Sequence, residues 1–193
     1  MHSGSATTPD STAKGSYVVH VALAADRVIV VRRRAGATRK LAPARAYFLS
    51  AGDYLYVGSA HGSAGLAGRV GRHLSPGKKK HWDIDFLLTG KDLLLAANVW
   101  GKTTRSAASA ECRWVAAILR MPGAYPVHGK VQTSPNLIRG FGAGDCEQRC
   151  GCRPGDPASA RTHLIRVEWK PSLEQLRSVL GRNLVDIRLR LDL

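Results

Sequence analysis

Short runs of β-branched and aromatic residues alternate with polar, glycine-containing segments in the first third of the chain. Residues 17–23 (Tyr-Val-Val-His-Val-Ala-Leu) and 28–31 (Val-Ile-Val-Val) are separated by Ala25-Asp26-Arg27. This pattern is typical of a β-hairpin. A third strand is predicted at 54–57, so we expect the three strands to form a small antiparallel sheet.

Helical spacing begins after the third strand. Leu66, Val70 and Leu74 recur at intervals of four before Ser75-Pro76-Gly77, a sequence that ends a helix. The pattern also predicts a short helix at 81–88, a long helix at 106–121 and a C-terminal helix at 173–184. Residues 93–100 fit a strand or a helix. We expect 122–161 to be irregular and 163–169 to form the last strand.

These elements predict an α+β fold in which helices flank a small, mostly antiparallel central sheet. The chain has 193 residues, 44% of them hydrophobic, which is enough for one ordinary core. We expect a disordered tail at 1–14, one domain at 15–170 and a helical extension at 171–193 that packs on the domain. No run of about 18 apolar residues occurs, which argues against a membrane-spanning helix.

The net charge of the chain indicates what kind of partner it binds. Lysine and arginine total 29 against 14 aspartates and glutamates, a formal net charge of +15. Arginine outnumbers lysine, and its guanidinium binds phosphate in bidentate fashion, so the excess favours nucleic acid as the partner. Coding bias toward arginine is the alternative. The sequence has four cysteines and we identify no secretory signal in it. We therefore expect the protein in a reducing compartment, the cytoplasm, where the cysteines would serve thiol or metal chemistry.

Two short motifs lie on the predicted strands. Gly15-Ser16-Tyr17 opens the first strand and Tyr56-Val57-Gly58 ends the third; Arg69 and His73 follow one helical turn apart, and Glu111 lies in a later helix. This ordered set resembles the GIY-YIG nuclease superfamily. Further motifs resemble an uncharacterised branch of it, a domain of unknown function sometimes fused to an endonuclease III-type DNA glycosylase. They are Gly58-Ser59-Ala60, Arg72-His73-Leu74, Lys80-His81-Trp82, Glu111-Cys112, Phe141-Gly142-Ala143, Asp145-Cys146 and His163-Leu164.

The resemblance implies hydrolysis of phosphodiester bonds in DNA with one divalent metal ion. By position, Tyr17 is the candidate general base or water-positioning phenol, and Tyr56 bonds the phosphate or the attacking water. Arg69 stabilises negative charge that develops on the phosphorus group, His73 assists proton transfer or contacts the phosphate, and Glu111 binds Mg²⁺ or Mn²⁺. A phenol with a pKa near 10 needs that pKa lowered by a metal or by arginine to act as a base.

Each assignment has a structural alternative. The two tyrosines could simply fill a sheet face, Arg69 and His73 could lie on a helix surface, and Glu111 could cap its helix or pair with an arginine. The chain also departs from the branch at one motif, where His81-Trp82-Asp83-Ile84-Asp85 replaces His-Trp-His-Ile-Asp. Asp83 or Asp85 could reach a metal or cap the short helix.

Two further groups of residues are candidates for binding. Basic residues near the motifs could bind nucleic acid, namely Arg32, Arg33, Arg34, Arg72, Lys78, Lys79, Lys80 and His81. A tetrahedral Zn²⁺ site could form from Cys112, Cys146, Cys152 and His163. The alternatives are a solvated charged loop in the first case and thiols without zinc in the second.

We therefore expect a metal-dependent endonuclease that acts on DNA, with a link to DNA repair. One rival is a nucleic-acid-binding module that keeps the cleft without turnover. The other is a zinc-stabilised domain whose positive charge contacts an acidic protein.

Overall fold

The computed structural model describes residues 13–32, 34–35, 40–89, 94–104, 110–131, 134–142 and 162–187. Within these ranges the protein is α+β, with a mostly antiparallel central sheet flanked by four helices, which confirms the predicted fold class. The strands are β1 (Gly15–Leu23), β2 (Arg27–Val31), β3 (Arg34–Ala35), β4 (Lys40–Leu41), β5 (Arg45–Leu49), β6 (Gly52–Ala60), β7 (Leu94–Thr103), β8 (Ala124–Pro126), β9 (His128–Val131), β10 (Ser134–Gly140), β11 (Leu164–Val167) and β12 (Val185–Asp186). The helices are α1 (Gly65–Leu74), α2 (Asp83–Leu87), α3 (Ala110–Leu119) and α5 (Leu173–Leu180).

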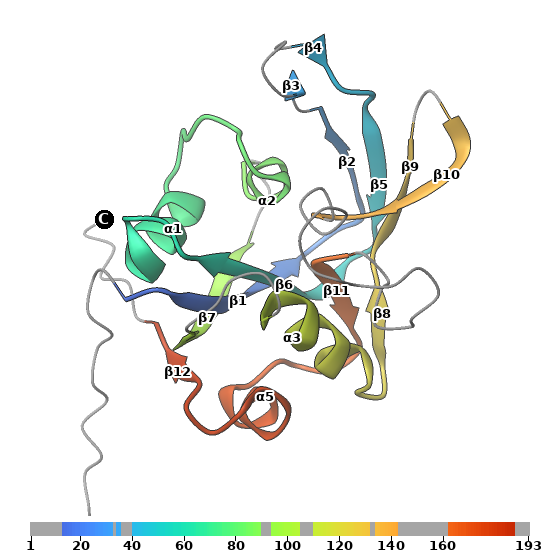
Figure 1. Cartoon of the computed structure of the whole chain (residues 1–193). Coiled ribbons are helices and arrows are strands. Elements are labelled where there is room, and N and C mark those ends of the chain that lie inside the picture. Colours follow the sequence, from blue (N-terminus) through green and yellow to red (C-terminus); the bar gives the residue numbers. More distant parts are fainter. Residues whose placement is uncertain are drawn as a thin grey trace, which may run out of the picture.

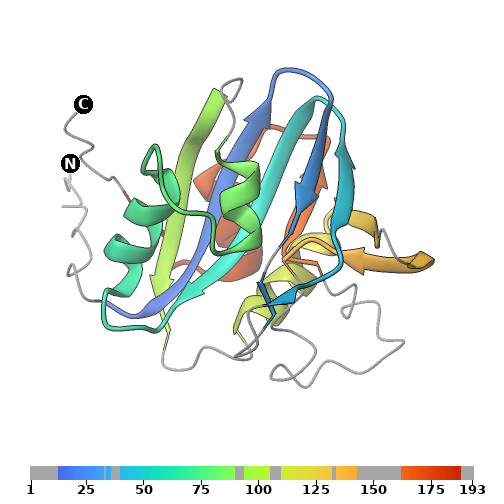
Figure 2. The ribbon, with the colours of Figure 1, turned by 90° about the horizontal axis from the view of Figure 1, so that it is seen from above.

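The central sheet has the order β12-β7-β1-β6-β11-β8, and every neighbouring pair in it is antiparallel. A second sheet has the order β10-β9-β5-β2, and β3 pairs with β4. In Figure 1 the central sheet lies between α1 and α2 on one side and α3 and α5 on the other. Figure 2 shows α1 and α2 in front of the strands when the molecule is seen from above.

The strand β1 lies in the middle of the central sheet and is buried on both faces. Tyr17, Val19 and Val21 contribute to the core beneath α1 and α2, whereas Val18 packs in the core beneath α3 and α5. Side chains of a strand alternate between the two faces, so one strand supplies both cores. This explains why residues 17–23 are apolar almost without interruption.

The expected hairpin between residues 17–23 and 28–31 is wrong. β1 pairs with β6 and β7, while β2 pairs with β5 in the second sheet. β2 alternates buried and exposed positions, unlike the fully covered β1, so the two segments meet different environments. The turn between them moves the chain from one sheet to the other.

The expectation of an irregular segment at 122–161 is also wrong for its described part, which forms β8, β9 and β10. These strands are short or interrupted by a register shift between Ser134 and Ile138, which weakens their sequence pattern. The helices predicted at 66–74 and 81–88 are confirmed as α1 and α2, and the described part of 106–121 contains α3. The helix predicted at 173–184 is α5, which ends earlier, at Leu180, and residues 94–100 belong to strand β7. The strand predicted at 163–169 is β11, but it is not the last one, because the described residues contain a further strand, β12, after it.

The C-terminal segment packs on the domain through α5. Leu176 and Leu180 of this helix share a core with Trp114 and Ile118 of α3. The Ser172 hydroxyl caps α5 by accepting a hydrogen bond from the Gln175 N–H at 3.2 Å. None of the helices in the described ranges is long and apolar enough to cross a membrane.

Candidate active site

The pairing of β1 with β6 brings the two motif tyrosines to one face of the sheet. Tyr17 is opposite Gly58, and Tyr56 is opposite Val19, so the two phenols are diagonal neighbours. A Cβ added to Gly58 would lie 2.5 Å from both Cζ and Oη of Tyr17. The glycine of the Tyr56-Val57-Gly58 motif is therefore needed because the Tyr17 ring occupies the space where a side chain would be.

Helix α1 lies over this face and supplies the next two residues. Leu66 and Val70 anchor it to the core, which turns His73 inward, where it is 1% exposed. Arg69 is one turn earlier, at the edge of the same face, with its guanidinium carbon 4.3 Å from the centre of the Trp82 ring. The aromatic face attracts the cation, so Trp82 helps hold Arg69 in place.

A chain of three buried side chains starts at Tyr17. Its hydroxyl oxygen lies 2.8 Å from His73 Nε2, and His73 Nδ1 lies 3.0 Å from Asp85 Oδ1. An ionised carboxylate can only accept hydrogen bonds, so Nδ1 is protonated and its N–H donates a hydrogen bond to Asp85. His73 Nε2 then has a free lone pair and accepts the hydrogen bond from the Tyr17 hydroxyl.

The carboxylate of Asp85 is fully occupied. Its Oδ2 accepts hydrogen bonds from Arg72 at 2.8 Å and from the backbone N–H groups of His81 and Trp82 at 2.9 Å. The two backbone bonds satisfy N–H groups before the first turn of α2, in the manner of a capping box. Of the two roles considered for Asp85, the structure shows the cap, together with the orientation of His73.

Asp83, the departure from the branch motif, is also paired. It accepts hydrogen bonds from Arg45 at 3.3 Å and from the Gly142 N–H at 3.1 Å. These two contacts join α2 to β5 and to the end of β10. The guanidinium balances the carboxylate charge beside the pocket.

Burial determines the protonation states in this chain. Burial raises the pKa of Tyr17 far above its ordinary value, against a smaller lowering by Arg69, and burial also raises the pKa of Tyr56. Burial lowers the pKa of His73, although the Asp85 hydrogen bond opposes this. Burial alone would raise the pKa of Asp85, but its hydrogen bonds from His73 and Arg72 hold that pKa well below the usual range.

At neutral pH the resting chain is thus a neutral phenol, a neutral imidazole and a carboxylate. The pKa of Tyr17 is therefore shifted in the direction opposite to the one that a phenolate base requires. A proton can still pass through Tyr17, because the neutral His73 accepts one as Tyr17 receives another.

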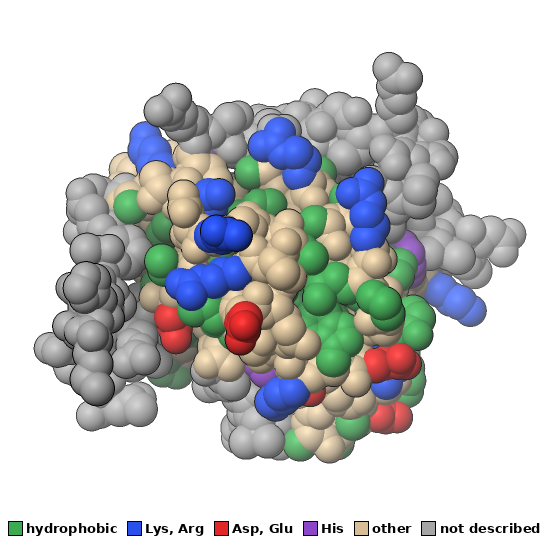
Figure 3. All heavy atoms as spheres, turned by 90° about the horizontal axis from the view of Figure 1, so that it is seen from below, with side chains coloured by type: hydrophobic (Ala, Val, Ile, Leu, Met, Phe, Trp, Pro, Cys, Tyr) green, Lys and Arg blue, Asp and Glu red, His purple; other side chains and the backbone are tan. Residues whose placement is uncertain are grey.

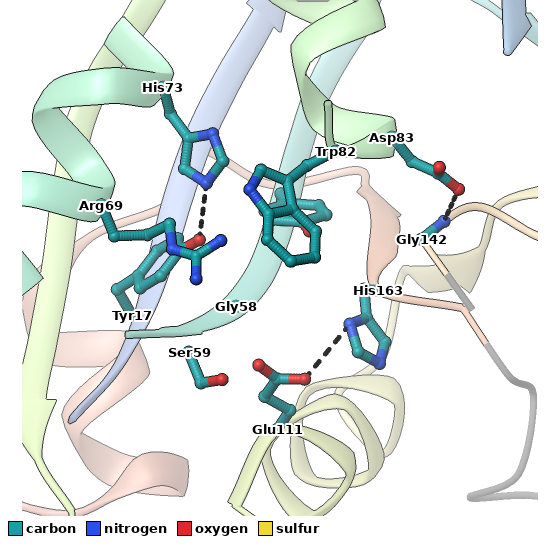
Figure 4. Close-up of a pocket in the computed structure, with 11 residues that line it drawn as sticks. Tyr17, Gly58, Ser59, Arg69, His73, Trp82, Asp83, Glu111, Gly142 and His163 are labelled. Carbon is teal, nitrogen blue, oxygen red and sulfur yellow. Dashed lines mark hydrogen bonds and ion pairs between the residues drawn. The ribbon is translucent and has the colours of Figure 1, made fainter. Parts of the chain in front are cut away.

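All five residues predicted to be catalytic line one pocket. Figure 4 shows Tyr17, Arg69, His73 and Glu111 converging on it, with Glu111 on the first turn of α3. The cavity offers about 90 Å³ to water-sized molecules, enough for several waters. The remaining lining residues are Tyr56, Gly58, Ser59, Trp82, Asp83, Gly142 and His163.

His163 is the residue whose place the sequence did not indicate. The sequence predicts it as a possible zinc ligand together with the cysteines, yet it lines this pocket with Nδ1 3.6 Å from Glu111 Oε2. Its position directly before β11, which pairs with β6 beside Tyr56, is the signal that could have placed it. Cys146 and Cys152 lie outside the described residues, and Cys112 is half-buried on α3 next to Glu111. Zinc binding stays a prediction.

The basic residues predicted to bind nucleic acid are only partly described. Arg32, Lys79, Lys80 and His81 are exposed. Arg72 bonds Asp85 and the Lys79 carbonyl, and Lys78 donates to the His73 carbonyl, so both also stabilise the connection between α1 and α2. Arg33 and the side chain of Arg34 lie outside the described residues.

The fold and the pocket define a class of protein, an α+β domain in which tyrosine, histidine, arginine and glutamate side chains share one polar cavity. The chain matches the family described as Domain of unknown function DUF123 over residues 17–181, and it belongs to that family. No curated protein and no solved structure matches it. Among the described residues, no group of three or more histidines, cysteines or acids is placed to hold a metal ion.

Proposed function

We propose that this protein is a metal-dependent phosphodiesterase of GIY-YIG type that cleaves DNA in the cytoplasm and serves DNA repair. One observation carries the proposal, namely that Tyr17, Tyr56, Arg69, His73 and Glu111 line one pocket although they come from β1, β6, α1 and α3. Phosphoryl transfer needs a cation aimed at the phosphate, a route for the proton of water and a carboxylate for a hard metal ion. The pocket contains each of these.

Arg69 is the cation of the pocket. The Trp82 ring beside it limits the directions in which the guanidinium can point, and no carboxylate in the described part of the chain forms an ion pair with it. Arginine remains charged and donates two parallel hydrogen bonds to a phosphate. We assign Arg69 to the non-bridging oxygens, where charge increases as the attacking oxygen approaches.

The chain from Tyr17 to Asp85 supplies the route for the proton. A water molecule at the Tyr17 hydroxyl attacks phosphorus and its proton passes to the Tyr17 oxygen, while the original phenolic proton passes to His73 Nε2. The bond from phosphorus to the leaving oxygen breaks, and that oxygen takes a proton from solvent. Asp85 stabilises the imidazolium that forms, so Tyr17 never has to become a free phenolate.

Glu111 is the candidate metal ligand. Its side chain is 20% exposed in the pocket, whereas Asp85 is saturated with donors and Asp83 is paired with Arg45. Mg²⁺ and Mn²⁺ prefer carboxylate oxygen and keep several waters, so one protein carboxylate with substrate phosphate fits them. When bound, such an ion polarises the phosphate and stabilises the leaving oxygen.

The charge of the chain supports an anionic polymer as substrate. Lys79 and Lys80 are exposed on the segment that leads from α1 to Trp82, at one side of the pocket. On the face seen in Figure 3, lysine and arginine side chains are spread widely. The net charge of +15 favours binding to a polymer of phosphates.

A cleavage assay tests the proposal. The protein is incubated with linear duplex, branched and single-stranded DNA in Mg²⁺ or Mn²⁺, and Glu111→Gln is the control for contaminating nuclease. We expect ion-dependent strand cleavage that the variant lacks. Binding of DNA without cleavage under all these conditions would instead favour the non-catalytic binding module.

A further inference from the structure

His163 and Glu111 face each other across the pocket and come from different elements. His163 precedes β11, and Glu111 opens α3; Figure 4 shows the two side chains pointing toward one another. The separation of 3.6 Å between Nδ1 and Oε2 is too long for a direct hydrogen bond. Two ligands that share an ion at about 2.1 Å are roughly 3.0 Å apart in octahedral and about 3.4 Å apart in tetrahedral geometry. The pair would have to close by about 0.2 Å to reach the tetrahedral spacing and by about 0.6 Å to reach the octahedral one.

The backbone holds His163 firmly. Its N–H donates to the Phe141 carbonyl at 2.6 Å, and its carbonyl accepts from the Val57 N–H at 2.8 Å. A Cβ at Gly142 would lie 3.0 Å from the Cβ of His163, so the neighbouring turn packs closely against it. The side chain is only 6% exposed, and it therefore has little freedom to turn away from Glu111.

We propose that His163 is the second protein ligand, with Glu111, of the divalent ion in this pocket. This inference rests on the proposed function, which requires the ion. It adds a nitrogen ligand to the carboxylate of Glu111. Mg²⁺ favours oxygen ligands, whereas an imidazole with a carboxylate suits Mn²⁺ and other transition metals better. The site should thus bind Mn²⁺ more tightly than Mg²⁺.

A different role for His163 predicts the opposite result. A protonated His163 that only pairs with Glu111 would compete with the cation for the carboxylate. Its removal would leave Mn²⁺ binding unchanged or make it tighter. The sign of the change therefore separates a ligand from a competing ion pair.

Calorimetric titration with Mn²⁺ and with Mg²⁺ makes this comparison on the full chain. His163→Ala should weaken Mn²⁺ binding by about tenfold or more and Mg²⁺ binding by less. His128→Ala, which removes an exposed histidine of β9 that does not line the pocket, is the matched control and should bind as wild type does. Unchanged or tighter Mn²⁺ binding by folded His163→Ala overturns the proposal, as does a wild type that binds no Mn²⁺.

A spectroscopic measurement on the wild type does not depend on whether the variant folds. Electron spin echo modulation of the Mn²⁺-loaded protein should show coupling to one directly bound imidazole nitrogen, and its absence overturns the assignment. Cleavage of DNA is scored separately. Nitrogen coupling without cleavage would reject the proposed function and keep the ligand, whereas cleavage without nitrogen coupling would keep the function and reject His163.

Discussion

The hydroxyl of Tyr17 lies 2.8 Å from Nε2 of His73, and both side chains are almost completely buried. This contact joins β1 to α1 and makes the phenol one member of a hydrogen-bonded chain that ends at Asp85. The roles of the two residues are thereby coupled. Neither can be assigned to proton transfer without the other.

Replacement of Tyr17 by phenylalanine tests this coupling. Tyr17→Phe keeps the ring in the core and removes the proton route, so we expect cleavage to fall about 100-fold or more. The stability should fall by about 1 to 3 kcal/mol, because the change leaves a buried histidine nitrogen without its donor. Single-turnover kinetics and urea unfolding measure the two effects. Cleavage at the wild-type rate would remove Tyr17 from the mechanism.

Asp85→Asn should lower activity by acting through His73. The amide can donate to Nδ1, which favours the histidine tautomer that cannot accept from Tyr17. The loss of the charge-assisted hydrogen bonds to His73 and Arg72 should also lower the free energy of unfolding by about 2 to 3 kcal/mol. The matched control is Asp53→Asn. Asp53 Oδ1 lies 2.5 Å from His20 Nε2, so this change disturbs another carboxylate–histidine pair, one that does not line the pocket. Equal loss of cleavage in both variants would show that stability alone explains the effect.

Gly58→Ala should displace the Tyr17 ring. The new methyl group would meet ring atoms at 2.5 Å, so either the ring or the strand must move. We expect a strong loss of cleavage and a destabilisation of about 1 to 3 kcal/mol. Gly71→Ala is the control, because a Cβ there meets nothing within 4 Å and alanine favours the helix. A crystal structure of Gly58→Ala with the Tyr17 hydroxyl unmoved would contradict this explanation.

The stability of the protein should decrease as the pH falls from about 6.5. The folded-state pKa of His73 is lowered, mainly by burial, so between that pKa and the ordinary value the unfolded chain binds more protons than the folded one. The free energy of unfolding therefore rises with pH in this window and loses the His73 contribution below it. Urea unfolding at a series of pH values measures the slope. His73→Gln should reduce it, and an unchanged slope would count against a buried neutral His73.

Much of the site could be predicted because its residues lie in short, ordered motifs. The strand containing Tyr17, the strand containing Tyr56 and the helix with Arg69 and His73 each have a local pattern, and the structure brings them to one pocket. Their catalytic roles stay predictions. The pairing of the first strand was not predictable in the same way, because β-branched composition specifies a strand and leaves its partner open.

The places of Asp85 and His163 in the site depend on tertiary contacts that no local sequence pattern encodes. The sequence left Asp85 as a cap or a metal ligand, and only the packing of α1 on α2 gives its carboxylate the donors from His73 and Arg72. His163 is comparable. The sequence allows it as a zinc ligand together with distant cysteines, whereas the pairing of β11 with β6 places it beside Glu111.

Single-turnover cleavage by Arg69→Ala tests the central claim, that this pocket hydrolyses phosphodiesters, most directly. Arg113→Ala, which removes an exposed arginine from α3, is the control for general loss of charge. We expect Arg69→Ala to cleave DNA at least about 100-fold more slowly than wild type in Mn²⁺ while its DNA affinity changes only a few-fold, and Arg113→Ala to cleave normally. Cleavage by Arg69→Ala at the wild-type rate, or a folded wild type that binds DNA and cuts none in any divalent ion, would contradict the claim.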